Sequence, residues 1–346
     1  MPPTLSDFRS DTVTRPTTAM RAAMAGAEVG DDVYGEDPTV RRLEEVTAER
    51  LGHQAGLFVT SGTQGNQIPI GIFCAPGDEV VVEANGHSVH YEAGATAGLW
   101  GVQIHPVASP RGILTEAQVR SALRPPGRDH EPRSRMLLLE NTHNRGGGTV
   151  WPLDTFQSAL GVAREHGLAV HLDGARLWNA EAATGVAARR WAELCDSTTV
   201  CFSKGLGAPV GSVLVGSQSF IHDARRLRKR LGGGMRQAGI LAAGALYALE
   251  HHLARLPEDH KNARLLAQGL SSLPGMAVDL ARVETNMVYA EFPCAAEAAA
   301  TYLRTAGVLA HPVGPRTLRF VCHLDVAEKD VRRALEAVAS LVAAPR

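Results

Sequence analysis

The sequence predicts an α/β protein, with a large domain built on a mostly parallel, seven-stranded sheet and a small α+β domain at the C-terminus. Three observations support this prediction. Short runs typical of β-strands alternate with helical patterns through the first 215 residues. Several strand runs, such as MLLLE and LAVHLD, are almost continuously apolar, as expected of strands covered on both faces. Near residue 250 the alternation gives way to charged helical segments.

The elements of the large domain follow in order along the chain. A helix is predicted after Asp37, which acts as N-cap, with Pro38 in its first turn and Gly52 at its end. A second helix of this design is predicted over residues 154–167. The alternation of strands and helices favours parallel strands with right-handed crossovers and helices on both faces. The seven predicted strands are residues 56–60, 79–83, 101–107, 135–140, 168–173, 198–203 and 211–216.

The two ends of the chain are predicted to form separate parts. We assign residues 1–14 to an N-terminal arm, 15–249 to the large domain and 250–346 to the small domain. Residues 1–36 have little periodicity, and a structureless segment of that length is uncommon, so we expect it to pack against the rest of the protein. The small domain is expected to contain helices to about residue 273, at 295–306 and at 327–342, and strands near 286–291 and 317–322.

Composition excludes several classes of protein. The formal net charge is −1, which gives no general attraction for nucleic acid or anionic membranes. The five cysteines form no CxxC pair, so we expect reduced thiols and neither a disulfide framework nor a metal site. The start of the chain has no signal-peptide pattern, and the longest apolar stretch, residues 239–249, is too short to span a bilayer. We therefore expect a cytoplasmic protein with no nucleic-acid or membrane partner.

The residues that indicate chemistry lie where predicted strands end. HLDGAR places His171, Asp173 and Arg176 after one strand, and Lys204 follows the next strand, just before a run of glycines. This pair suits pyridoxal phosphate, whose aldehyde forms a Schiff base with a lysine amine and whose ring nitrogen stays protonated beside a carboxylate. Taken alone, a strand-end Asp is more often a turn residue, and a Lys more often a solvated one.

Three other motifs follow strands in the same way. SGTQGN contributes Ser61, Gly62 and Thr63 at a strand-to-helix turn, which is typical of an anion cradle although a plain capped turn is equally compatible. His87 is placed to cover an aromatic ring or to lie in a surface loop. His143, before three glycines, is a candidate general acid or base or a loop residue.

Two basic features complete the set. Arg319 lies on a strand of the small domain, where a guanidinium suits a carboxylate ligand but is also common as an exposed residue. RRLRKR, at residues 225–230, has five basic residues in six and is most often a solvated helical face. The glycine-rich LGGGMRQ that follows it indicates close approach of the backbone to another group.

Taken together, these motifs resemble those of the low-specificity L-threonine aldolases, pyridoxal phosphate enzymes of the aspartate-aminotransferase fold, type I. The resemblance covers nearly the whole chain. SGTxxN and the Asp–Lys pair occur in many enzymes with this cofactor. The segments that look specific to the family are EVGDDVYGEDPTV, LENTHN, SKGLGAPVGS and GGGMRQ.

The resemblance implies a role for each motif residue. Lys204 is the expected Schiff-base lysine, Asp173 the partner of the pyridine nitrogen, and His87 the residue stacked on the ring. Ser10, Arg176 and Arg319 are expected to bind the substrate carboxylate, and His143 to lie near the substrate hydroxyl. The other expected cofactor or substrate contacts are Ser61, Gly62, Thr63, Arg176, Tyr34, Tyr91 and, from a neighbouring subunit of a homotetramer, Lys229 and Arg236.

The implied reaction is the reversible cleavage of L-threonine or L-allo-threonine to glycine and acetaldehyde. His143, or His87 through water, is the expected base for the β-hydroxyl proton, and the residues leave that choice open. Other reactions of the same cofactor, namely β-elimination, transamination and hydroxymethyl transfer, are the related alternative. A non-enzymatic protein that binds RNA or an acidic partner through RRLRKR is the alternative from a different class.

Overall fold

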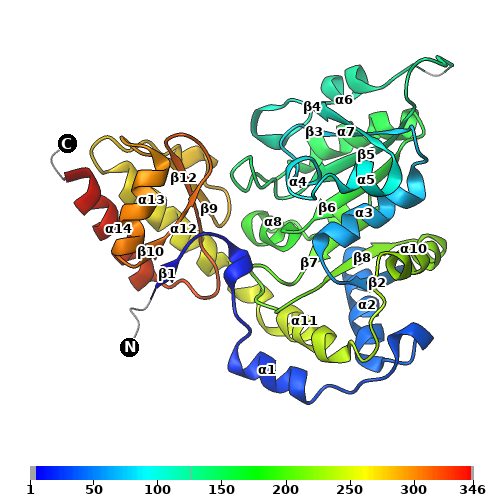
Figure 1. Cartoon of the computed structure of the whole chain (residues 1–346), viewed down its shortest axis with the longest axis horizontal. Helices are drawn as coiled ribbons and strands as arrows, with labels where there is room; N and C mark the ends of the chain where they lie inside the picture. Colours follow the sequence, from blue (N-terminus) through cyan, green and yellow to red (C-terminus); the bar gives the residue numbers. More distant parts are fainter. Residues whose placement is uncertain (1–4, 126, 344–346) are drawn as a thin grey trace.

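The computed structural model describes residues 5–125 and 127–343. The chain forms a large lobe and a smaller lobe beside it, the latter built from the C-terminal part (Figure 1). Residues 1–4 of the predicted arm and 344–346 of the predicted small domain lie outside the described residues. Which residue separates one domain from the next stays a prediction. None of the described helices is long and apolar enough to cross a membrane.

The large lobe contains the predicted seven-stranded sheet. Its strand order is β2-β8-β7-β6-β5-β3-β4, and only β8 runs antiparallel to its neighbours. The prediction of a mostly parallel sheet is therefore confirmed, with strand ends displaced by at most two residues. The strands are β2 (Ala55–Val59), β3 (Glu79–Glu83), β4 (Gln103–Val107), β5 (Ser134–Glu140), β6 (Ala169–Gly174), β7 (Ser197–Cys201) and β8 (Ser212–Gly216).

Helices cover both faces of this sheet, which explains the apolar strand runs. On β2, Leu57 and Val59 pack with residues of α3 and α10, whereas Phe58 packs on the opposite face in the cluster that includes α2. The helices are α1 (Thr18–Ala25), α2 (Pro38–Leu51), α3 (Gly62–Phe73), α4 (His87–His90), α5 (Ala95–Trp100), α6 (Glu116–Ala122), α7 (Leu153–Glu165), α8 (Leu177–Thr184), α9 (Arg189–Ala192), α10 (Gln218–Arg230) and α11 (Gly239–His251).

The ends of these helices follow from local chemistry. Asp37 caps α2 by accepting from the backbone N–H groups of its first turn, and Gly52 ends it in the left-handed region at φ 76°. Helix α7 begins at Leu153, one residue before the predicted start, because the chain turns into the helix directly after Pro152.

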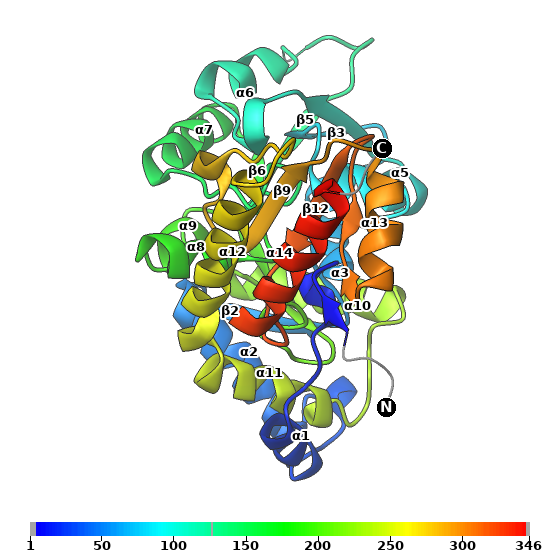
Figure 2. The ribbon, with the colours of Figure 1, turned by 90° about the vertical axis from the view of Figure 1, so that its left-hand side faces the viewer.

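The small lobe has its own sheet and its own core. Its antiparallel strands have the order β11-β12-β9, and a separate hydrophobic cluster lies between them and three helices. Figure 2 shows these helices in front of the large lobe. The predicted strands and helices are confirmed here, apart from a break between α11 and α12. The elements are α12 (Leu256–Ser271), β9 (Met287–Glu291), α13 (Ala296–Thr305), β11 (His311–Pro312), β12 (Thr317–Val321) and α14 (Glu328–Ala343).

The N-terminal segment connects the two lobes. Strand β1 (Ser6–Asp7) pairs in parallel with β10 (Val308–Leu309) of the small lobe, and Phe8 is buried in that lobe's core. The chain then passes to α1 under the large lobe (Figure 1). The expectation that this segment packs against the protein is confirmed for its described residues.

Candidate active site

The candidate site lies at the carboxyl edge of the large sheet. Strands β3, β5, β6 and β7 run parallel to one another and end at this edge. His87 follows β3, His143 follows β5, Asp173 lies at the end of β6, and Lys204 follows β7. Open α/β sheets bind ligands at this edge, so the fold gathers the four principal residues predicted from the sequence where a ligand is expected.

Asp173 and Lys204 differ in how the protein surrounds them. Asp173 is 2% exposed and accepts hydrogen bonds from the Ala175 backbone at 3.0 Å and the Asn66 side chain at 2.8 Å. Burial opposes ionisation, but the charges of His87 and Lys204 and these hydrogen bonds lower the Asp173 pKa below its usual value. The Lys204 ammonium forms no hydrogen bond or ion pair with any described residue, which leaves it available to a ligand.

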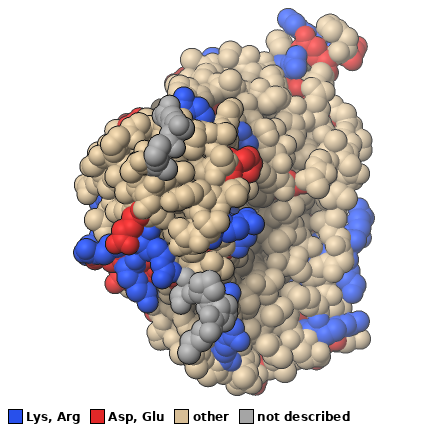
Figure 3. All heavy atoms as spheres, turned by 60° about the vertical axis from the view of Figure 1, so that its left-hand side comes forward, with Lys and Arg blue, Asp and Glu red and all other residues tan. Residues whose placement is uncertain are grey.

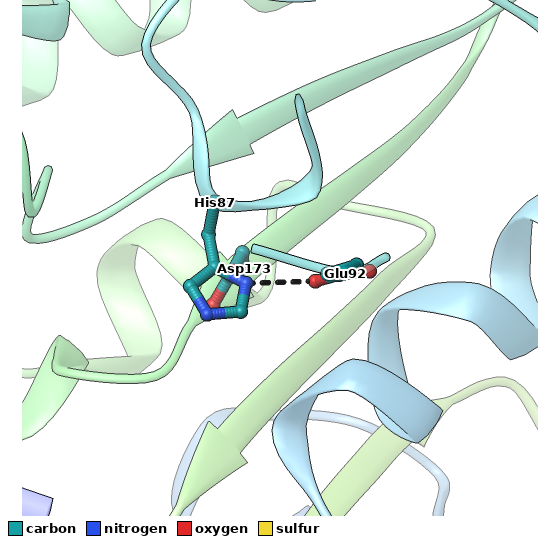
Figure 4. Close-up of side chains that lie close together, drawn as sticks. All are labelled: His87, Glu92 and Asp173. Carbon is teal, nitrogen blue, oxygen red and sulfur yellow. Dashed lines mark hydrogen bonds and ion pairs between the residues drawn. The ribbon is translucent and has the colours of Figure 1, made fainter. Parts of the chain in front are cut away.

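His87 stands beside Asp173, and a second buried carboxylate holds it there (Figure 4). Its Nδ1 lies 2.9 Å from Glu92 Oε1. His87, Glu92 and Asp173 offer nitrogen and oxygen atoms within 4.8 Å of one another, a spacing compatible with a metal ion. However, the Asn66 and Gln67 amides already donate to Glu92 at 2.8 and 2.6 Å, and N–H donors repel a cation. The Glu92 oxygens are therefore already engaged by donors of the protein.

The start of α3 lies against the end of β7. A Cβ at Gly62 would stand 2.9 Å from Cys201 Sγ, and one at Gly65 would stand 2.5 Å from Thr199. Glycine therefore lets the first turn of α3 approach the strand that leads to Lys204. Ser61 caps the helix by accepting from the Gln64 backbone at 3.2 Å. The unpaired N–H groups and positive dipole of this helix end are the chemistry expected of a phosphate site.

The N-terminal segment brings Ser10 between two arginines. Arg176 donates from Nε and Nη2 to Asp11, at 2.7 and 2.6 Å, and both side chains are buried. Arg319 Nη2 donates to the Arg9 carbonyl at 3.0 Å, while its buried Nε has no partner among the described residues. The predicted carboxylate-binding residues thus come together, but Asp11 occupies one edge of the Arg176 guanidinium. The Nη1 nitrogen of Arg176 and the Nε of Arg319 remain for a ligand.

His143 is enclosed on both sides. Its Nδ1 accepts from the Gly146 backbone at 3.0 Å, and its Nε2 lies 3.0 Å from Glu83 Oε2 and 3.9 Å from Glu140 Oε2. Burial lowers the His143 pKa, but the charges of Glu140 and Glu83 and the contact with Glu83 more than offset it, so the pKa is raised. Any side chain at Gly112 would overlap the His143 ring.

Three predicted contacts, Tyr34, Lys229 and Arg236, lie away from this centre, and Tyr91 lies at its edge. The Tyr91 ring is 5.5 Å from that of His87, and its hydroxyl accepts from Arg145 at 3.2 Å. Arg236 pairs with Asp31 at 3.0 Å. Figure 3 shows that the face between the lobes is hollowed, with basic side chains beside the hollow. No described contact joins Tyr34, Lys229 or Arg236 to Lys204 of the same chain.

The basic run at residues 225–230 is not a simple solvated face. Arg228 is 2% exposed and donates to Asp32 at 2.6 Å and to the Phe58 carbonyl at 2.8 Å. Arg225 pairs with Glu44 at 2.9 Å. These arginines join α10 to its neighbours, which argues against their use in binding RNA.

Sequence reasoning missed the buried polar residues around the principal four. The amide of Asn66 donates to Asp173 and Glu92, and its carbonyl lies 3.1 Å from His171 Nε2. Asn66 belongs to the motif SGTQGN, and Asp11 directly follows Ser10. Both residues therefore lie in or beside positions that the sequence had already indicated. Glu92 was not, because nothing in HYEAG marks a buried carboxylate.

Comparisons with known proteins show the family of this chain. A model of the beta-eliminating lyase family matches residues 7–293. The chain belongs to the beta-eliminating lyase family. One relative of this chain is low-specificity L-threonine aldolase 1 of Arabidopsis thaliana. The two are 45% identical over 336 residues, which cover 95% of this chain and 94% of that protein. The low-specificity L-threonine aldolase of Escherichia coli K12 is 43% identical, covering 94% and 96%.

Solved structures confirm the fold of this beta-eliminating lyase family member. Leishmania major threonine aldolase superimposes with a TM-score of 0.85 at 22% identity, covering 97% of this chain and 99% of that one. Sphingomonas wittichii serine palmitoyltransferase gives a TM-score of 0.74 at 20% identity, covering 97% and 86%.

The residues present fit pyridoxal phosphate. The approach of α3 to β7 at Gly62 leaves helix N–H groups for a phosphate. The carboxylate of Asp173 suits a protonated ring nitrogen. The amine of Lys204, which has no hydrogen-bond or ion-pair partner among the described residues, suits an aldehyde.

Proposed function

We propose that this member of the beta-eliminating lyase family is a pyridoxal phosphate enzyme that cleaves L-threonine and L-allo-threonine to glycine and acetaldehyde. Other β-hydroxy-α-amino acids are cleaved in the same way, and the reaction is reversible. The observation that carries the proposal is the meeting of Lys204, Asp173 and His87 at one sheet edge. Its specific form rests on 45% identity to a low-specificity L-threonine aldolase over 95% of the chain.

The cofactor is held from three directions. When bound, it supplies an aldehyde that joins an amino group and a ring that takes up the electrons of the broken bond. Lys204 attaches it covalently, and the carboxylate of Asp173 keeps its ring nitrogen protonated. Ser61, Gly62 and Thr63 bind its phosphate at the start of α3, and His87 covers one face of its ring.

The arginines fix how the substrate is presented. Arg319 Nε, buried and without a partner among the described residues, binds the substrate carboxylate together with Ser10 and the Nη1 end of Arg176. By fixing the carboxylate, these residues would decide which bond at Cα is presented for cleavage. Cleavage needs one proton removed from the β-hydroxyl and one delivered to Cα. His87 and His143 are the groups placed to move the first.

Lys204→Ala tests the assignment of the attachment residue. We expect turnover of L-threonine to fall by roughly a thousandfold or more, because the amine that holds and releases the cofactor is lost. The measurement is acetaldehyde release coupled to NADH oxidation, with the absorbance spectrum of the purified protein recorded beside it. Turnover at the wild-type level in this variant would refute the assignment.

Product analysis separates this function from its alternatives. Glycine and acetaldehyde in equal amounts support aldol cleavage, whereas 2-oxobutanoate and ammonia from threonine indicate elimination. A change in the cofactor absorbance on adding glycine supports binding of the reaction product at the same site. A colourless protein that cleaves no β-hydroxy-amino acid would exclude the proposed function.

We further propose a homotetramer that works in the cytoplasm. In it, Lys229 and Arg236 reach the phosphate of a neighbouring subunit, and Tyr34 lines that subunit's site. Tyr34 is 76% exposed, which fits a role outside its own subunit, and all five cysteines are free thiols. Light scattering is expected to give about four times the chain mass of 36.8 kDa. Cofactor affinity is expected to fall in Lys229→Ala.

A further inference from the structure

The two histidines at the site each face a buried carboxylate, but through different ring nitrogens. Glu92 lies at Nδ1 of His87, at 2.9 Å, whereas Glu83 lies at Nε2 of His143, at 3.0 Å. A carboxylate that accepts from an imidazole decides which nitrogen carries the proton and which keeps its lone pair. The difference therefore gives the two rings different chemistry.

For His87 the free nitrogen is Nε2. Glu92 is an acceptor, so the hydrogen bond places the proton on Nδ1 and leaves the lone pair on Nε2. Nε2 has no hydrogen-bond partner among the described residues, and the side chain is 26% exposed, so a substrate hydroxyl or a water reaches it.

For His143 no nitrogen keeps an accepting lone pair for a substrate. The Gly146 backbone N–H donates to Nδ1 at 3.0 Å, so in the neutral ring the proton is on Nε2. Nε2 lies 3.0 Å from Glu83 Oε2 without forming a hydrogen bond to any described residue, and the side chain is only 1% exposed. The loop carrying Gly112 closes over the ring. His143 is thus shaped to be a fixed group at the wall of the site.

Glu92 itself is held rigidly. Its side chain is fully buried, and two amides of α3 donate to it, Asn66 to Oε1 and Gln67 to Oε2. Because Asn66 also donates to Asp173, the same helix orients the partner of the His87 ring and the predicted partner of the cofactor nitrogen. The position of Glu92 is therefore set by the core and not by solvent.

We infer that Glu92 is a positioning residue that makes His87, rather than His143, the proton acceptor for the substrate β-hydroxyl. The inference rests on the proposed aldol cleavage and names the base within it. Glu92 touches neither substrate nor cofactor in this role. It acts by fixing the His87 tautomer and by placing a negative charge beside the ring.

The charges around His87 define the expected pH dependence. The titratable groups facing it are Glu92, Glu140 and Asp173, and the Tyr91 ring stands beside it. Burial lowers the His87 pKa, but the hydrogen bond to Glu92 and the three carboxylate charges outweigh it, so the pKa is raised. Removing the Glu92 charge will therefore lower the pKa, which moves the acid limb of kcat/KM to lower pH.

The experiment compares Glu92→Gln, Glu92→Asp and, as a matched control on the other pair, Glu83→Gln, all as holoenzymes. In Glu92→Gln we expect kcat at neutral pH to fall by about 10–100-fold with little change in KM. The acid limb is expected to shift down by about one pH unit. Glu92→Asp keeps the negative charge. The acid limb of its kcat/KM profile therefore stays near the wild-type position, although its kcat falls. Glu83→Gln lowers activity without moving the limb.

A second measurement does not depend on turnover. Diethyl pyrocarbonate modifies unprotonated imidazoles, and peptide mass spectrometry resolves His87 from the other histidines. At pH 5.5 we expect His87 to react severalfold faster in Glu92→Gln than in the wild type, because a lower His87 pKa leaves more of the ring unprotonated. His130, which is 80% exposed, is the internal reference and is expected to react equally in all variants.

The outcomes separate this inference from the proposed function. An unmoved acid limb and unchanged His87 reactivity in Glu92→Gln would overturn the role of Glu92. A limb that moves in Glu83→Gln instead would assign the base to His143. If the wild type releases no aldehyde, the proposed function fails, and the His87 reactivity still reports whether Glu92 controls the ring.

Discussion

His171 illustrates how a single buried side chain becomes sensitive to pH. It lies between Ser197 Oγ, 2.8 Å from Nδ1, and Asn66 Oδ1, 3.1 Å from Nε2. The Asn66 carbonyl can only accept, so Nε2 carries the proton and Ser197 donates to Nδ1. Burial is the dominant cause that lowers the His171 pKa to about 4. The ring is therefore neutral, and it orients the amide that bonds Asp173.

This environment predicts a loss of stability in mild acid. The unfolded chain binds a proton at His171 near pH 6.5 and the folded chain only near pH 4, so stability falls as the pH drops between these values. Between pH 6.5 and 5 the loss is about 2 kcal/mol. Urea unfolding at pH 7 and pH 5 will show a smaller drop in His171→Gln than in the wild type. An equal drop in both proteins would contradict this account.

Gly112 is a second residue whose role only the structure reveals. It has φ 84°, and any Cβ there would overlap the ring of His143. Gly185 is a matched control, because it has φ 71° with nothing within 4 Å of its Cβ position. We expect Gly185→Ala to cost about 1 kcal/mol of stability from backbone strain alone.

Gly112→Ala introduces the same backbone strain, and its new methyl group also displaces the His143 ring. We expect a further loss of about 1–3 kcal/mol and a reduced kcat. Thermal unfolding and threonine cleavage of the two variants will show the difference. Equal stability and full activity in both would mean that the ring moves aside at no cost.

At the scale of elements, the N-terminal segment is the part that completes the site. Strand β1 pairs with β10, and the 3₁₀ turn Asp11–Val13 then places Asp11 against Arg176. Thr14 Oγ1 donates to the Lys204 carbonyl at 2.8 Å. One stretch of chain thus contacts the small lobe, Arg176 and the backbone of Lys204.

Asp11→Asn tests the importance of this contact. The Arg176 charge would stay buried with only a neutral partner, so we expect a loss of about 3–5 kcal/mol of stability and a raised KM for threonine. Burial opposes ionisation of Asp11, but the Arg176 charge lowers its pKa far below the usual 3.8. This stabilisation is therefore present at neutral pH and is lost as pH falls below about 4 towards that lower pKa.

The control for this variant lies in the same segment. Asp7 pairs with Arg9 at 2.6 Å, but Arg9 is 48% exposed, and such surface pairs contribute less than about 1 kcal/mol. We expect Asp7→Asn to keep nearly full stability and an unchanged KM. Comparable losses in the two variants would show that the segment, and not the Asp11–Arg176 pair, is what matters.

At the scale of the whole molecule, the site is shared between two lobes with separate cores. Small-lobe side chains hold the loop after β5. Arg319 and the Tyr289 hydroxyl each donate to Asn144 at 3.0 Å, and Thr285 donates to the Gly148 carbonyl at 3.0 Å. The loop after β5, which carries His143, is therefore held in place by both lobes.

Cofactor removal is expected to lower thermal stability. A cofactor present at a hundred times its Kd adds about 2.7 kcal/mol, which corresponds to a fall in Tm on the order of 5 °C when it is removed. Differential scanning calorimetry of the holoenzyme and apoprotein measures this shift. Pyridoxal, which lacks the phosphate, is the control. It should restore only part of the Tm, because it makes no phosphate contact with the start of α3. Full restoration would contradict the phosphate site at Ser61–Thr63.

Local patterns were enough to predict much of this protein. The apolar runs predict seven strands covered on both faces, because such runs are stable only when buried. Caps such as Asp37 act within a few residues of themselves, so the helix bounds are also predictable. The strand-end positions of His87, His143, Asp173 and Lys204 place them together as soon as the strands are taken as parallel.

Long-range packing decided the rest. The sequence determined the fold class, the sheet edge that carries the candidate site and the residues proposed for the cofactor. Only the tertiary structure decided that Asp11 faces Arg176, that Glu92 and Glu83 meet different nitrogens of two histidines, and that Arg228 is buried. A buried polar contact needs a partner far away in the chain. No local pattern specifies that partner, since it depends on how α3, the loops and the small lobe pack together.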